Sequence, residues 1–179
     1  MVSRRQFWLY AMGIRRSRQE WATRVRALPP ERQLPDGANR MRELLRDGPK
    51  TVKELGDDAT GFLGTLSFYV DLVRVPPSGT WERRRADRLT LAEDWVGPND
   101  ATEDQGLEHL VRSYLRAFGP AAWGDISSWA GISVADTRRG AANLALTRFQ
   151  DAGGKELVDL AGAPLPDPAT PAPVRFLPH

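Results

Sequence analysis

The sequence contains no cysteine and only two histidines among its 179 residues. Without cysteine, disulfide bonds and thiolate metal sites are excluded. The two imidazoles, His109 and His179, lie in unrelated contexts, so we expect no metal site and no cofactor. No apolar run approaches the ~20 residues that a membrane-spanning helix needs. We therefore expect a cytoplasmic protein without a membrane partner.

Lysine is also scarce, because 22 of the 25 basic residues are arginine. These charges are unevenly spread: residues 1–90 carry a net charge of +7 and residues 91–179 a net charge of −5. The planar guanidinium fork matches phosphate groups and guanine edges better than an ammonium group does. An arginine-rich proteome would explain the preference for arginine, but it would not explain the clustering. The clustering predicts double-stranded DNA as the partner, held mostly through its backbone.

Two stretches 71 residues apart share one pattern, in which a helix meets a Gly-Pro pair and a second helix follows at once. The pairs are Gly48-Pro49 and Gly119-Pro120. Glycine can end a helix by adopting the left-handed conformation, and the fixed φ of proline suits the first turn of the next helix. Two helices joined so closely meet at a steep angle, as in helix-turn-helix units. The repeat predicts an α+β, mainly helical chain with tandem winged-helix units.

The first half of the chain has the element order of one winged helix behind an N-terminal helix. Capping residues, apolar spacing and turn residues define its elements. We expect a basic helix over 3–28, a linker over 31–37, a helix capped by Asn39, a short helix opened by the capping box Thr51–Glu54, a third helix over 59–70, and a hairpin with strands 72–75 and 81–91.

The second half repeats this order after an acidic linker over 93–103. Its first helix has the strongest amphipathic pattern of the chain, and a capping box at Thr102–Gln105 starts it. The remaining elements are expected to be a short helix ending at Trp129, a long helix over 133–150, and a wing with strands 156–160 and 174–177. The expected domains are residues 1–36 for the N-terminal helix and linker, 37–97 for the first unit, and 98–179 for the second, with its wing possibly truncated.

The run Leu110–Gly131, LVRSYLRAFGPAAWGDISSWAG, resembles the winged-helix family of crosslink-repair DNA glycosylases of the AlkZ/YcaQ type. The segment Pro173–Pro178, PVRFLP, is also similar to a stretch of that family. The resemblance covers most of residues 40–179. It implies tandem winged helices followed by a β-barrel, and removal of alkylated or crosslinked bases by hydrolysis of the N-glycosidic bond.

The sequence departs from this family at the catalytic signature, a Gln-x-Gln or Gln-x-Asp pair. None of its glutamines has Gln or Asp two positions later; they are Gln6, Gln19, Gln33, Gln105 and Gln150. The sequence also stops at His179, before the barrel that the resemblance implies. We therefore expect a DNA-binding chain without catalytic residues, completed by a separate catalytic or C-terminal domain.

The candidate DNA contacts are polar side chains on the first wing, beside the first Gly-Pro pair and on the expected helices over 59–70 and 133–150. Arginines on a wing can follow a phosphate backbone or enter a minor groove, although charges on an edge strand also prevent aggregation. Strand alternation would place Arg84 and Arg88 on one face of the first wing. The full set is Arg83, Arg84, Arg85, Arg88, Lys50, Lys53, Thr60, Arg138, Arg139 and Asn143.

Three aromatic or imidazole side chains have a structural interpretation as well as a functional one. Trp123 and Trp129 could stack on an extruded base, but we expect them to pack against the helix over 107–118. His109 beside an apolar position is expected to be structural rather than catalytic.

Two alternative functions remain at this point. A winged-helix transcriptional regulator would prefer one operator over random DNA by orders of magnitude. The short side chains expected on the helix over 59–70 argue against such reading of bases. An inactive, truncated family member would expose apolar surface and self-associate.

Overall fold

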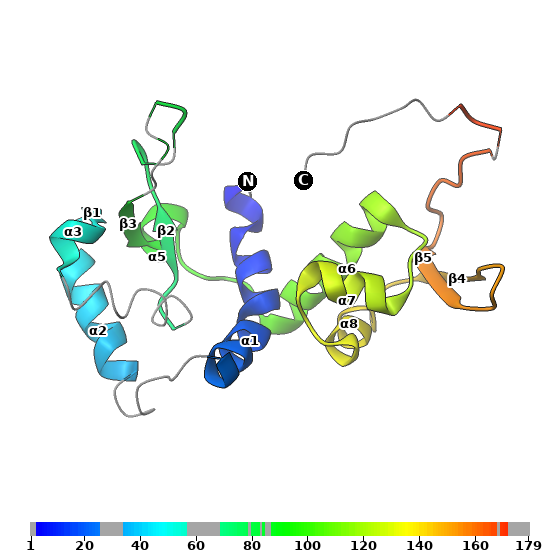
Figure 1. Ribbon diagram of the computed structural model, residues 1–179, viewed down its shortest axis with the longest axis horizontal. Coiled ribbons are helices and arrows are strands. Elements are labelled where there is room, and N and C mark those ends of the chain that lie inside the picture. Colours follow the sequence, from blue (N-terminus) through cyan, green and yellow to red (C-terminus); the bar gives the residue numbers. More distant parts are fainter. Residues whose placement is uncertain are drawn as a thin grey trace.

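The computed structural model describes residues 3–25, 34–56, 69–78, 80–82, 84, 87–167 and 169–171 (Figure 1). The fold is α+β, with helices and two small antiparallel sheets. None of the described helices is both long enough and apolar enough to cross a bilayer. Two lobes stand on either side of helix α1, Phe7–Val25, which follows a 3-10 turn at Arg4–Gln6 (Figure 1).

The first lobe, called unit 1 below, extends from α2 to α5. Its sheet has the antiparallel order β1-β3-β2, so the short strand before α3 pairs with the last strand of the hairpin. Helix α2 buries one face, with Met41 and Leu45 packed against Leu55, Leu89 and Leu91. The elements are α2 (Leu34–Leu45), β1 (Lys50–Thr51), α3 (Val52–Leu55), β2 (Leu72–Arg74), β3 (Arg88–Leu91) and α5 (Ala92–Val96).

The second lobe, unit 2, extends from α6 to β5. Its core centres on Val111, Ile126 and Val158, all fully buried. The predicted capping box is present, since the backbone N–H of Thr102 donates to Gln105 at 2.8 Å and the N–H of Gln105 donates to the Thr102 hydroxyl. The elements are α6 (Glu103–Phe118), α7 (Trp123–Ala130), α8 (Val134–Gly140), β4 (Leu146–Gln150) and β5 (Glu156–Leu160).

Helix α1 packs on α6 through two facing glycines. A Cβ atom at Gly13 would lie 2.7 Å from the carbonyl carbon of Gly106, and one at Gly106 would overlap the backbone nitrogen of Gly13. This absence of side chains lets the two helix backbones approach closely. Tyr10 and Ile14 then pack against Leu107, Leu110 and Ile132.

The helix expected over 133–150 is wrong in its second half. Helix α8 ends at Gly140, and residues 146–150 form β4, which pairs residue by residue with β5. Leu146 and Leu160 are paired across the hairpin and both pack on the unit 2 core, which favours a strand over a continued helix. The second hairpin therefore joins 146–150 to 156–160, and the strand expected over 174–177 lies outside the described residues.

Unit 1 departs from expectation in three places. Helix α2 begins at Leu34, so Asn39 lies inside it rather than capping it, and part of the expected linker is helical. The second strand of the first hairpin begins at Arg88 rather than at residue 81. The helix expected over 59–70 falls almost wholly outside the described residues.

The two Gly-Pro pairs end their helices by different means. Gly48 has a φ of +114°, a positive value that favours glycine, as expected. Gly119 has a φ of −71°, which any residue can adopt. The left-handed explanation is therefore wrong for Gly119. A Cβ atom there would lie 2.6 Å from Cγ of the buried Asp159, so a close approach requires the glycine.

Candidate nucleic-acid interface

The loop between β2 and β3 is closed at its base by buried polar contacts. The Ser78 hydroxyl is buried, donates to the Asp87 carboxylate at 2.7 Å and accepts from the backbone N–H of Arg88 at 3.0 Å. The N–H of Val75 donates to the carbonyl of Arg88 at 3.1 Å. These bonds hold the two ends of the loop together, so that its middle projects away from the sheet (Figure 1).

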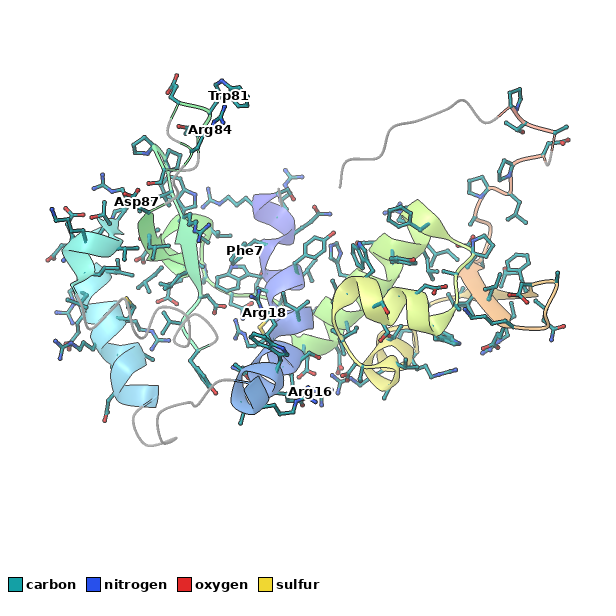
Figure 2. All side chains as sticks on the ribbon, in the orientation of Figure 1. Phe7, Arg16, Arg18, Trp81, Arg84 and Asp87 are labelled. Atoms are coloured by element: carbon teal, nitrogen blue, oxygen red, sulfur yellow. The ribbon has the colours of Figure 1, made fainter. Side chains whose placement is uncertain are left out.

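The far end of this loop carries an indole and a guanidinium. Trp81 is 86% exposed, and the guanidinium carbon of Arg84 lies 4.9 Å from the centre of the indole ring. Figure 2 shows both side chains at the tip of the projection. Arg83 and Arg85 lie outside the described residues. The expectation that Arg84 and Arg88 share a strand face is wrong, because Arg84 precedes the strand.

Arg88 instead connects the hairpin to the Gly-Pro joint. Its Nε and Nη2 atoms donate to the carbonyl oxygen of Pro49 at 3.2 and 3.1 Å. This bidentate bond holds β3 against the turn that precedes β1, so Arg88 has a structural role.

Lys50 and Lys53 lie on β1 and α3, close to the same joint, and Thr60 is not among the described residues. Lys53 is exposed and Lys50 is half-buried. Hydrogen bonds from Thr51, the backbone bond first, lower the pKa of the neighbouring Glu54, and the charges of Arg88 and Lys50 lower it further. One carboxylate therefore balances part of this basic cluster.

In unit 2, Arg138 lies over the face of Trp123, with its guanidinium carbon 4.8 Å from the ring centre. Trp123 is buried, as expected, and its indole N–H donates to Glu156 at 2.9 Å. That bond, followed by the hydrogen bond from Arg148 and the charges of Arg148 and Arg138, lowers the pKa of Glu156. Arg138 is thus exposed but stacked on a ring that belongs to the core.

Arg139 is surrounded by carboxylates. It forms ion pairs with Glu103, Asp104 and Asp136, and the bond to Glu103 is the main cause of its raised pKa. Binding a phosphate would therefore require Arg139 to leave existing partners. Asn143 is exposed in the turn after α8.

The predicted contacts do not gather on one surface. In Figure 1 the β2–β3 loop projects from the lobe on one side of α1, and helix α8 lies in the lobe on the other side. The structure brings Lys50, Lys53 and Arg88 together near β1, and it places Arg84 at the loop tip and Arg138 and Arg139 on α8. The two units thus present separate candidate surfaces.

Sequence reasoning overlooked Trp81 because the residue was assigned to a strand. The available signal was an aromatic residue in a polar stretch, after Pro-Pro-Ser-Gly-Thr and before Glu-Arg-Arg-Arg. Trp129, expected in the core, is 47% exposed, although its ring contacts Tyr114 at a centroid distance of 5.4 Å. His109 packs edge-to-face on Tyr10, and burial followed by the charge of Arg112 lowers its pKa, in keeping with a structural role.

Within the described residues, no group of three or more His, Asp or Glu side chains is arranged to hold a metal ion. No catalytic pair was predicted from the sequence, so there is none to locate in the structure. The surfaces described above carry exposed cations and an exposed indole, and nucleic-acid-binding proteins use side chains of these types to contact phosphates and to stack on bases.

Comparisons with known proteins agree with this chemistry. The family model described as "DNA glycosylase AlkZ-like" matches residues 2–179. No curated protein sequence matches the chain. Among solved structures, the Streptomyces sahachiroi DNA glycosylase AlkZ aligns with 86% of this chain at a TM-score of 0.59 and 19% sequence identity. The chain spans under half of that protein, covering 46% of its length. Because the family model matches almost the entire sequence, the chain belongs to the AlkZ-like family of DNA glycosylases.

Proposed function

We propose that this chain is a tandem winged-helix module that holds duplex DNA for a base-excision repair activity. The observation that carries the proposal is a repeated topology. In unit 1, β1 directly follows Gly48-Pro49 and pairs with the last strand of the hairpin, β3. In unit 2, Ala121 directly follows Gly119-Pro120 and pairs with Val158 of the last strand, β5. Helix, short extended segment, helix and hairpin in this arrangement are the plan of a winged helix.

The binding surface we propose is basic and faces the phosphate backbone. The charge comes from the exposed Lys53 and the half-buried Lys50 beside the unit 1 joint, and from the exposed Arg84 on its loop and Arg138 on α8. These side chains come from separate surfaces, which suits contact along a duplex rather than reading of one short sequence. Membership of a DNA glycosylase family supports DNA as the partner.

This chain has no catalytic role in the proposal. The Gln-x-Gln or Gln-x-Asp pair that marks catalysis in the resembling family is absent from the sequence. Removal of a damaged base by hydrolysis then depends on residues that this chain does not supply. The module contributes affinity and position, which are required before a base can leave the stack.

Fluorescence anisotropy with a labelled random-sequence duplex at about 50 and 200 mM salt tests the proposal. Binding is expected to weaken by more than about tenfold, since each released counterion contributes to the salt slope. Replacing Lys50 and Lys53 by alanine should reduce that slope by about two, one for each lost phosphate contact. The matched control is Lys155→Ala, on the exposed turn of the unit 2 hairpin.

Three outcomes would contradict the proposal. An affinity that does not change with salt would exclude a phosphate-binding module. Strong preference for one sequence from a random pool would indicate a transcriptional regulator. No binding at low salt would indicate an inactive member of the family.

A further inference from the structure

Trp81 is far more exposed than any other large apolar side chain in the described part of the chain. Its exposed fraction is 86%, against 61% for Phe118, 50% for Trp95 and 47% for Trp129. A large aromatic surface held in water is unfavourable unless a partner covers it in the functional state. The position of Trp81 at the tip of a loop, with the sheet far behind it, leaves its ring accessible (Figure 2).

The loop presents this ring from an ordered base. The buried hydroxyl of Ser78 joins Asp87 and the backbone of Arg88, and the Thr80 hydroxyl donates to the Pro77 carbonyl at 2.8 Å. The loop is thus tied at Ser78 and Thr80 on one side of Trp81 and at Asp87 and Arg88 on the other, which limits the conformational entropy lost when the tip binds. The tip is thus built to project rather than to fold back on the core.

The partner of this tip must accept both a flat apolar ring and a positive charge. Arg84 lies against the indole, so the same few ångströms present a π-face and a guanidinium. Nucleic acid offers this combination, because each base has a π-face and each sugar is followed by a phosphate. The net charge of +7 over residues 1–90 favours a polyanion over an apolar protein surface.

Intact duplex DNA does not expose base faces, because every base is stacked on its neighbours. An indole can stack only where a neighbour is missing, or where the step has been opened at a cost of free energy. A site that has already lost a base offers such a gap without that cost. The indole therefore discriminates between damaged and intact duplex, while phosphate contacts do not.

We propose that Trp81 and Arg84 form a probe for unstacked steps in duplex DNA. The indole enters the gap and stacks on the exposed base, and Arg84 binds a phosphate beside it. This inference rests on the proposed function, that the chain holds duplex DNA. It adds a substrate class, duplex interrupted by a missing or displaced base, and a residue that selects it.

The test compares two duplexes that differ at one position. One is fully paired, and the other carries a tetrahydrofuran abasic analogue at its centre. The chain should bind the interrupted duplex on the order of tenfold more tightly, as expected for one base–aromatic stacking contact. Trp81→Ala should abolish this preference and leave affinity for the intact duplex within about twofold, whereas Trp81→Phe should retain part of it.

Trp95→Ala is the matched control, because Trp95 is a half-exposed tryptophan on α5 of the same unit. It should keep the full preference. Arg84→Gln should weaken binding to both duplexes and lower the salt slope by about one. Thermal melting of each variant establishes that it is folded, which is expected because Trp81 lies outside the core.

The possible failures are distinguishable. Equal affinity for the two duplexes, or a preference that survives Trp81→Ala, would overturn the probe and leave the DNA-holding role intact. Loss of preference in Trp95→Ala as well would show a general effect of tryptophan removal and would also overturn the probe. No binding of the unmodified chain to either duplex would overturn the proposed function and the inference together.

Discussion

Helix α1 meets unit 2 through apolar packing and the ion pairs of Arg16, whereas its contacts with unit 1 include an ion pair and hydrogen bonds. On the unit 2 side, Tyr10 and Ile14 pack into a cluster with buried residues of α6. On the unit 1 side, Arg15 forms an ion pair with Asp71 at 2.6 Å, with both side chains about one-third exposed. An exposed ion pair contributes about 0–1 kcal/mol, whereas burying one large apolar side chain contributes about 1.5–3 kcal/mol. Helix α1 is therefore a structural part of unit 2 that also touches unit 1.

Two hydrogen bonds from α1 and from the 3-10 turn before it reach the end of unit 1. The indole N–H of Trp8 donates to the carbonyl of Gly97 at 2.9 Å, and Nε of Arg4 donates to the carbonyl of Val96 at 2.7 Å. Both acceptors lie at the end of α5, where the chain leaves unit 1. Directional bonds at this point orient the unit, while apolar packing supplies most of the stability on the other side.

The largest effect is expected when the α1–α6 contact is broken by one methyl group. Gly106→Ala puts a Cβ atom onto the backbone of Gly13 and 2.6 Å from the carbonyl oxygen of Leu9. Alanine usually stabilises a helix interior by about 1 kcal/mol relative to glycine, but this overlap should destabilise the protein by about 2–3 kcal/mol. Urea unfolding monitored by circular dichroism measures the change.

Gly124→Ala is the control for this substitution. Gly124 also lies in a helix of unit 2, and a Cβ atom there would meet nothing within 4 Å. This variant should be unchanged or more stable by up to about 1 kcal/mol. If the two variants had equal stability, the close crossing of α1 and α6 would be refuted.

The next largest losses of stability are expected at the two Gly-Pro joints. Gly48→Ala should cost about 1–2 kcal/mol from backbone strain, because its φ is +114° and no neighbour lies within 4 Å. Gly119→Ala should cost a similar amount through overlap with Asp159, since its φ of −71° suits alanine.

The Asp159→Ala background separates strain from overlap. Removing this carboxylate should relieve part of the cost of Gly119→Ala, because the contact of the new Cβ atom with the Leu115 carbonyl oxygen at 2.7 Å remains, and it should leave the cost of Gly48→Ala unchanged. A double-mutant cycle in urea would detect this as coupling at Gly119 alone. If the cost of Asp159→Ala simply adds to the cost of each glycine substitution, overlap with Asp159 is not the reason for the glycine at position 119.

The smallest effect is expected from pH, and it should reach unit 2 before unit 1. Burial, followed by the charge of Arg112, lowers the pKa of His109 below its ordinary value of 6.5. The unfolded chain therefore binds a proton before the folded chain does, so stability falls as pH decreases below about 6.5. His109→Gln should flatten this dependence between pH 7.5 and 5.0 in urea unfolding.

In unit 1 the titrating group is Glu54, and its protonation changes stability only at lower pH. Hydrogen bonds from Thr51 lower the pKa of Glu54 below 4.5, so its contribution is present above that pH and is lost as pH falls through the folded value. Both proteins contain His179, so any contribution of His179 to the pH dependence of stability is the same in the two and cancels. An unchanged pH profile for His109→Gln would exclude His109 as the source of the acid response.

Local signals in the sequence were enough for elements whose structure depends on nearby residues. Helix α6 begins at the capping box of Thr102 and ends before Gly119, as expected, because its cap and its apolar stripe are both contained in residues 102–118. The capping box of Thr51 and Glu54 is also present. The family resemblance found in residues 110–131 agrees with the family model.

Contacts between distant segments decided the rest. Residues 146–150 form a strand because β5 pairs with them, and Gly119 is glycine because Asp159 lies 40 positions along the chain. The exposure of Trp81 depends on where the bonds of Ser78 and Asp87 close the loop. The sequence alone determined the helices that carry their own caps and apolar faces. Only the tertiary structure decided strand β4, the close glycine contacts and the projecting indole, because each depends on a partner that local sequence does not contain.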